Sequence, residues 1–212
     1  MRAEQLRVVV AGTAGGVGAT TLTSVLFHAL VSSARPAPQL LDHTGGTLGT
    51  RLPDGAEVTQ LDDRWQLHDL GPLAATAGVA ALADPTCWLV VVGAATPRGC
   101  ALAAQTLDAV AASSSGDGLG RTVLVLAAVA GRHRIAAEVA GLHRPGLRAV
   151  VLVPHDDALA AGGRIVASLL SRATGQAVRQ LLAALPVGVT AEVPGPVGAS
   201  GSSTAGRGGP GA

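Results

Sequence analysis

The segment with the clearest chemical pattern is a glycine-rich stretch near the start of the chain, from Gly12 to Thr21. Its glycines would let successive backbone N–H groups turn toward one anion at the start of a helix, which is how many proteins hold phosphate. A threonine hydroxyl at the helix start is the usual oxygen ligand for a phosphate-bound Mg²⁺ ion. The alternative is an empty turn, whose glycines only allow close packing of helix on strand. The candidate cofactor-binding residues of this stretch are Gly15, Gly16, Val17, Gly18, Ala19, Thr20 and Thr21.

Two carboxylates follow predicted strands and are candidate metal ligands beside Thr20. Asp42 ends the run at 39–42, and Asp69 ends the run at 65–69. Ligands of open α/β sheets bind beyond the carboxyl ends of the strands, so both carboxylates are expected at the same edge as the glycine loop. The alternative for each is a structural role, because Asp at the start of a turn accepts hydrogen bonds from the backbone that follows. No spacing of a nucleophile and its base is legible, so we predict no catalytic side chain.

An alternation of strands and helices along the chain positions these groups. Apolar runs predict strands at 6–11, 39–42, 65–69, 87–92, 122–129 and 149–153. Apolar residues at helical spacing predict helices at 19–31, 73–83, 101–112, 135–142 and 157–185, the last with a break at Gly162 and Gly163. This alternation predicts a single α/β domain of three layers, with a doubly wound, mostly parallel sheet between helices.

Composition narrows the classes of function. The chain has 212 residues and a net charge of +1, and its 15 basic residues include no lysine. Lysine-based catalysis is therefore excluded, and nucleic acid is not an expected partner. The domain is expected to span 1–185, followed by a Gly/Pro/Ser-rich disordered tail at 186–212. We expect a cytoplasmic protein, because no leader pattern, bilayer-length apolar run or amphipathic membrane-targeting helix is present.

The glycine loop, AGGVGATT at 14–21, resembles the KGGVGKTT loop of the MinD/ParA-type deviant P-loop ATPases. The segments QLLDHTGGTL at 39–48, LHDLGPL at 67–73 and VPHD at 153–156 follow in the family's order, each at a strand end. The likeness is greatest to the pilus- and secretion-associated TadZ/CpaE-like branch, whose loop is often degenerate. It implies a P-loop NTPase-like fold that binds ATP or ADP with Mg²⁺. By the same resemblance, the metal ligands are Thr20, Asp42 and Asp69, and the base pocket is lined by Pro154, His155 and Asp156.

Several positions depart from that family pattern. Ala14 and Ala19 replace the two lysines that contact phosphates across the dimer and within the subunit. Thr44 stands where the family has a second aspartate that positions the attacking water, and Ala127 and Ala128 stand where a base-reading asparagine often lies. Removing one such electrostatic contact costs roughly 2.7–4 kcal/mol in comparable active sites, so ATP hydrolysis is expected to be weak or absent. Arg98, after the fourth predicted strand, is the candidate replacement for a lysine and completes the predicted cofactor-binding residues.

Three functions remain open at this stage. The first is a nucleotide-binding regulator that positions or assembles a pilus, secretion or septum machinery. It would act through protein partners and a homodimer, and a partner would recruit it to the membrane or the cell pole. The second is a pseudo-ATPase scaffold that works without nucleotide. The third is an active partition-type ATPase that uses an arginine in place of lysine.

Overall fold

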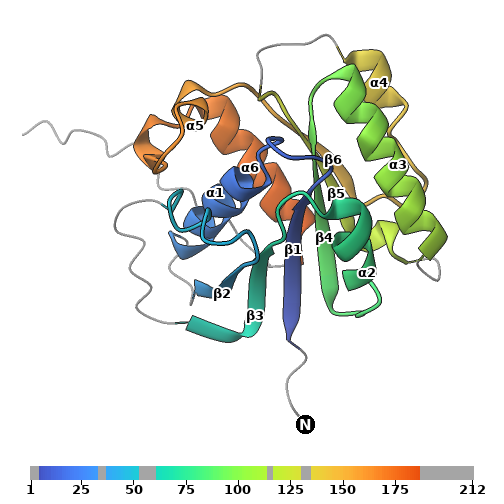
Figure 1. Ribbon diagram of the computed structural model, residues 1–212, viewed down its shortest axis with the longest axis horizontal. Coiled ribbons are helices and arrows are strands. Elements are labelled where there is room, and N and C mark those ends of the chain that lie inside the picture. Colours follow the sequence, from blue (N-terminus) through green and yellow to red (C-terminus); the bar gives the residue numbers. More distant parts are fainter. Residues whose placement is uncertain (1–4, 33–36, 53–60, 114–116, 130–134, 187–212) are drawn as a thin grey trace, which may run out of the picture.

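The centre of the protein is a sheet of six parallel strands in the order β2-β3-β1-β4-β5-β6 (Figure 1). The computed structural model describes residues 5–32, 37–52, 61–113, 117–129 and 135–186. The predicted α/β class and doubly wound sheet are confirmed, and every strand pair is parallel. Apart from Pro186, the predicted tail lies outside the described residues. The strands are β1 (Leu6–Gly12), β2 (Ala37–Asp42), β3 (Leu61–Asp69), β4 (Cys87–Ala94), β5 (Thr122–Ala127) and β6 (Ala149–Val153).

Helices cover both faces of this sheet and enclose two apolar cores. Alternate residues of β1 show the division, because Val8 and Val10 belong to one core and Val9 and Ala11 to the other. The first core packs against α1 and α6, and the second against α2 and α3 (Figure 1). Alternation of this kind is expected for central strands of a sheet that is buried on both faces. The helices are α1 (Ala19–Val31), α2 (Val79–Ala81), α3 (Pro97–Ser113), α4 (Ala136–Ala140), α5 (Asp157–Ala160) and α6 (Arg172–Ala184).

The last predicted helix, at 157–185, differs most from the structure. α5 ends at Ala160, and α6 begins only at Arg172, after a stretch that contains a short 3₁₀ turn at Ala167–Leu169. Gly162 and Gly163 have φ of 75° and 63°, in the left-handed region that ends a right-handed helix. Ser171 then caps α6, since its hydroxyl oxygen accepts a hydrogen bond from the Thr174 N–H at 3.1 Å. The predicted break is confirmed in place but is much longer than expected.

The helix predicted at 73–83 is also irregular. It begins as a π-helical turn at Ala74–Gly78 and continues into α2. A Cβ atom at Gly78 would lie 3.2 Å from Leu89 Cδ1 and 3.4 Å from Ala11 Cβ, so glycine lets this turn lie directly on the sheet. Among the described residues, no helix combines the length and apolar character needed to cross a membrane.

Candidate functional site

The glycine-rich loop connects β1 to α1 with the backbone geometry of an anion-binding loop. Gly16 and Gly18 have φ of 74° and 93°, a conformation that favours glycine. A Cβ at Gly12 would lie 2.7 Å from Val17 Cγ2, so glycine at that position lets Val17 close the base of the loop. Gly18 is the N-cap residue of α1, and no side chain caps this end of the helix. The N–H groups of the first turn are therefore left for the loop opening or for a ligand.

Asp69 lies at the end of β3 beside this loop and is fully buried, with 0% of its surface exposed. Its Oδ1 accepts a hydrogen bond from the Gly71 N–H at 2.9 Å, whereas its Oδ2 has no hydrogen-bond partner among the described residues. Burial raises the pKa of Asp69, and the Gly71 N–H and the nearby Thr20 hydroxyl oppose that shift. A buried carboxylate oxygen without a partner, next to a threonine hydroxyl, is the donor set that a Mg²⁺ ion takes in proteins. Thr20 and Asp69 therefore fit the predicted metal site.

Asp42 pairs with Asp69 in the register of β2 and β3, but its carboxylate is turned to its own loop. Its Oδ1 accepts hydrogen bonds from the Thr44 N–H at 2.7 Å and the Thr44 hydroxyl at 2.6 Å, and its Oδ2 accepts one from the Leu48 N–H at 3.2 Å. Desolvation alone would raise the pKa of Asp42, but these hydrogen bonds outweigh it and lower the pKa. The role predicted as the alternative, turn capping, is thus present. Either oxygen retains lone pairs for a cation.

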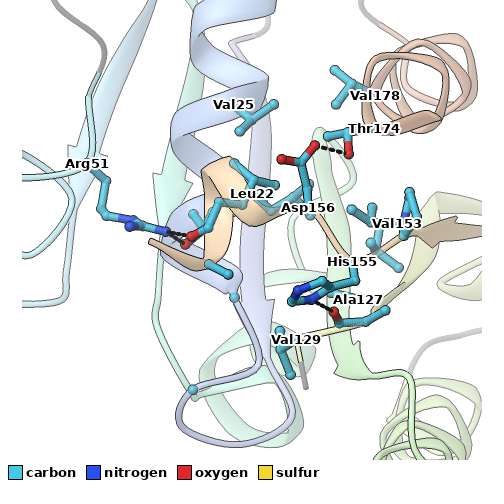
Figure 2. A pocket seen from close by; sticks show the side chains of 18 residues that line it. Leu22, Val25, Arg51, Ala127, Val129, Val153, His155, Asp156, Thr174 and Val178 are labelled. Atoms are coloured by element: carbon cyan, nitrogen blue, oxygen red, sulfur yellow. Dashed lines mark hydrogen bonds between the residues drawn. The ribbon is translucent and has the colours of Figure 1, made fainter. Parts of the chain in front are cut away.

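A cavity of about 230 Å³ opens next to the loop, between α1, the ends of β5 and β6, and α6 (Figure 2). It brings together six of the predicted cofactor-binding residues: Gly16, Gly18, Thr21, Pro154, His155 and Asp156. The other predicted site residues do not line it: Gly15, Val17, Ala19, Thr20, Asp42, Asp69 and Arg98. Sequence reasoning missed most of the apolar wall, which includes Leu22, Val25, Val125, Val153, Leu159 and Val178.

Asp156, predicted to line the base pocket, holds the fold together at the wall of this cavity. Its Oδ1 accepts a hydrogen bond from the Ala158 N–H at 3.0 Å, and its Oδ2 accepts from the Ser171 N–H at 2.9 Å and the Thr174 hydroxyl at 2.6 Å. Asp156 is 7% exposed. Desolvation would raise the pKa of Asp156, but the hydrogen bonds from Thr174, Ser171 and Ala158 lower it overall. The carboxylate joins the start of α5 to the start of α6.

His155 lies over the end of β5 and is held by the backbone. Its Nδ1 lies 3.0 Å from the carbonyl oxygen of Ala128, so Nδ1 carries the proton and donates it (Figure 2). Its Nε2 lies 3.3 Å from the exposed carboxylate of Asp157. The ring therefore presents one fixed, partly exposed nitrogen at the edge of the cavity.

A cation that the sequence analysis missed, Arg51, lines the cavity opposite His155 (Figure 2). Its Nη2 donates to the Thr21 hydroxyl at 2.6 Å and the Leu159 carbonyl at 3.0 Å, and its Nη1 donates to the Gly163 carbonyl at 3.1 Å. Burial lowers the pKa of Arg51, although an arginine remains charged at neutral pH. Arg98, the predicted replacement for a lysine, is instead exposed in the first turn of α3 and lies outside the cavity.

Two histidines form a second polar group that the sequence analysis assigned no role. His43 Nε2 lies 3.1 Å from His68 Nδ1, and His68 Nε2 lies 3.2 Å from the Gln66 side-chain oxygen. Since an amide oxygen only accepts, His68 carries its proton on Nε2 and accepts from His43 through Nδ1. Burial, together with the charges of His43 and Arg7, lowers the pKa of His68 to about 4.

The described residues contain no cluster of three or more His, Cys, Asp or Glu side chains able to hold a metal by themselves.

Comparisons with known proteins place the fold. No protein-family model matches the chain, and no curated protein matches it. Among solved structures, the crystal structure of a ParA family ATPase from Chlorobium tepidum TLS superposes with a TM-score of 0.61 at 15% sequence identity. The match covers 84% of this chain and 99% of that chain. The chain therefore has a ParA/MinD-like P-loop fold, while the resemblance to the TadZ/CpaE-like branch stays a prediction.

Proposed function

We propose that the chain is a MinD/ParA-like regulatory protein that binds ATP or ADP with Mg²⁺ and hydrolyses ATP slowly or not at all. The observation that carries this proposal is the unpartnered Oδ2 of buried Asp69, which lies beside Thr20 and the glycine loop. Leaving a buried carboxylate oxygen without a partner costs free energy that a bound cation would recover. The structural likeness to a ParA family ATPase supports the same reading at the level of fold.

The same site explains why nucleotide binding is expected to be retained although ATP hydrolysis is weak or absent. Backbone N–H groups of the loop and a cation held by Thr20, Asp69 and Asp42 need no lysine to hold phosphate. Bound Mg²⁺ would offset the negative charge of the phosphates. Positioning of an attacking water has less support, because the Thr44 hydroxyl that stands in place of a carboxylate is hydrogen-bonded to Asp42.

We further propose that such a protein acts through protein partners, in positioning or assembling a pilus, secretion or septum machinery. Support for this part comes from the resemblance of the loop at 14–21 to the pilus- and secretion-associated branch. A homodimer with nucleotide at its interface belongs to the same proposal. Ala14 offers no cross-dimer contact to phosphate, so such a dimer would be weaker than one with lysine at that position.

The second candidate function is a scaffold that needs no nucleotide. The observation in its favour is that Asp156 and Asp42, two of the predicted site carboxylates, already hold local structure. On this reading the glycine loop would serve helix packing alone, and Asp69 would bind no cation.

Thermal unfolding with and without nucleotide separates the two functions. An affinity of about 1 mM would stabilise the folded state by about 1 kcal/mol at about 5 mM Mg-ATP or Mg-ADP, a rise in Tm of about 2–4 °C. Thr20→Ala is the matched control, since it removes the hydroxyl and leaves the loop glycines unchanged. A rise in the wild type that is lost in this variant supports nucleotide binding. No rise for either nucleotide would leave the scaffold.

A further inference from the structure

The two ends of the proposed nucleotide site differ in how many of their polar groups are free. At the loop end, the first-turn N–H groups of α1 have no side-chain cap and Asp69 Oδ2 has no partner among the described residues. At the cavity end, the polar groups that line the wall already bond to one another. A protein can recognise a ligand by direct hydrogen bonds only where its donors and acceptors are not already paired within the protein.

The side chains at the cavity end illustrate this. Asp156 accepts three hydrogen bonds from the protein, and one of them comes from the Thr174 hydroxyl. The Thr21 hydroxyl accepts from Arg51, and Arg51 donates in addition to two backbone carbonyls. Figure 2 shows the bond between Asp156 and Thr174 and the bonds of Arg51 as dashed lines on opposite sides of the view. His155 also has protein neighbours at both ring nitrogens, because Nδ1 lies 3.0 Å from the Ala128 carbonyl and Nε2 lies 3.3 Å from the exposed Asp157 carboxylate.

The backbone at the end of β5 is equally occupied. The carbonyl oxygen of Ala127 accepts from the Ala95 N–H at 2.8 Å and the Val129 N–H at 3.0 Å. The Ala128 N–H donates to the Val153 carbonyl at 2.9 Å, and the Ala128 carbonyl accepts from His155. The rest of the wall is largely aliphatic, with Val25 and Val178 on facing helices. This surface offers dispersion contact to a flat ring but few groups that distinguish one ring edge from another.

We infer that this cavity takes the base of a nucleotide without selecting its identity, so that the chain binds purine and pyrimidine nucleotides with similar affinity. The inference rests on the proposed nucleotide binding and adds the class of ligand. Nucleobases differ in the donors and acceptors on their edges. A site discriminates strongly only when a wrong ligand leaves its own buried polar groups unpaired, whereas an aliphatic pocket discriminates weakly. Here the buried groups are paired before any ligand arrives.

The test compares equilibrium binding of ATP, GTP, CTP and UTP, each with Mg²⁺, and of inorganic triphosphate with Mg²⁺. We expect the four nucleotides to bind within about fivefold of each other, and triphosphate to bind at least about fivefold more weakly because it lacks the ring. A preference of more than about 30-fold for one base would overturn the inference and leave nucleotide binding intact. Equal binding of triphosphate would overturn the placement of the base in the cavity. If none of the five ligands bound, the proposed function would fail together with the inference.

Three variants locate the effect. Ala127→Leu fills the cavity from its β5 wall and is expected to weaken all four nucleotides by a similar factor while leaving triphosphate unchanged. Ala101→Leu makes the same substitution at an exposed position of α3 and is expected to change neither. His155→Ala removes the imidazole ring at the cavity edge and is expected to leave the ratios among the four nucleotides unchanged. Loss of triphosphate binding in Ala127→Leu, with its Tm unchanged, would contradict the inference, as would a base preference that depends on His155.

Discussion

Two buried aspartates, Asp69 at the end of β3 and Asp156 at the N-cap of α5, have the same side chain and opposite surroundings. Asp156 is 7% exposed and both of its oxygens accept hydrogen bonds from the protein, which together lower its pKa. Asp69 is 0% exposed, one of its oxygens has no partner among the described residues, and burial raises its pKa. The first carboxylate is stabilised by the fold, and the second is held by the fold at a cost.

The difference separates structural from functional roles within one site. The hydrogen-bond partners of the two carboxylates make this distinction. A carboxylate whose two oxygens both accept hydrogen bonds from the chain, as in Asp156, contributes to stability. A buried carboxylate with an open oxygen, beside the Thr20 hydroxyl, is suited to bind a cation.

Replacing Asp156 should produce the largest loss of stability. Asp156→Ala leaves the Ser171 N–H and the Thr174 hydroxyl without their acceptor, so we expect the free energy of unfolding to fall by about 3 kcal/mol and Tm by about 6–12 °C. Urea denaturation measures this change. Asp157→Ala, at the fully exposed neighbouring carboxylate, is the matched control and should change stability by less than about 0.5 kcal/mol. Equal effects of the two substitutions would contradict the structural role of Asp156.

The second-largest difference in stability is expected between substitutions of Arg51 and Arg98. Arg51→Met removes the donor to Thr21, Leu159 and Gly163, and we expect a loss of about 1–2 kcal/mol in the free energy of unfolding. Arg98→Met changes an exposed side chain in the first turn of α3 and should alter stability by less than about 0.5 kcal/mol. Both are measured by chemical denaturation. A larger loss for Arg98 than for Arg51 would reverse the assignment.

Asp69→Asn should have a small effect of opposite sign to Asp156→Ala. The amide oxygen of asparagine can still accept the Gly71 N–H, and a neutral amide costs less to bury than an ionised carboxylate. We expect the free energy of unfolding without nucleotide to stay constant or rise by up to about 1 kcal/mol. A decrease of more than about 2 kcal/mol would show that Asp69 stabilises the fold as Asp156 does.

The dependence of stability on pH should distinguish the same two residues. The pKa of Asp156 lies below its ordinary value of 3.8, so its contribution is complete above 3.8 and is lost as pH falls through the lowered pKa. The pKa of Asp69 is raised, so its contribution is complete below 3.8 and is lost as pH rises through the raised pKa. Asp156→Asn should therefore reduce the loss of stability in acid. Asp69→Asn should reduce the decline in the free energy of unfolding as pH rises above 3.8. Denaturation curves measured over this pH range check both effects. The account would be contradicted if the two variants changed the slope of the free energy of unfolding against pH in the same direction.

Much of the fold was predictable because its signals are local. The apolar runs that became β1, β4 and β5 and the glycine loop before α1 are each contained within a few residues of sequence. The placement of Asp42 and Asp69 at one edge followed from the rule that parallel strands end together. The end of α5 was less predictable, because a stretch rich in alanine and leucine hid the new start of α6 at Ser171.

The missed parts of the site depend on contacts between distant segments. Arg51 donates hydrogen bonds to the carbonyls of Leu159 and Gly163, which lie more than 100 positions further along the chain. No pattern in the sequence around Arg51 predicts these partners. The pairing of Asp156 with Thr174 likewise depends on how α6 packs after the irregular stretch. His43 and His68 come together only because β2 and β3 are neighbours. The one local signal was that each histidine lies next to a predicted site aspartate.

The most direct test of the central claim is a titration of the protein with a fluorescent ATP analogue, with Mg²⁺ present and after its removal by a chelator. If Thr20 and Asp69 hold the cation, the wild type should bind the nucleotide at least about tenfold more tightly with Mg²⁺, a difference of about 1.4 kcal/mol. Asp69→Asn should lose most of that difference while its Tm without nucleotide stays the same or rises. Binding that is equal with and without Mg²⁺, or a Mg²⁺ effect of the same size in Asp69→Asn, would contradict the claim that the open oxygen of Asp69 marks a cation and nucleotide site.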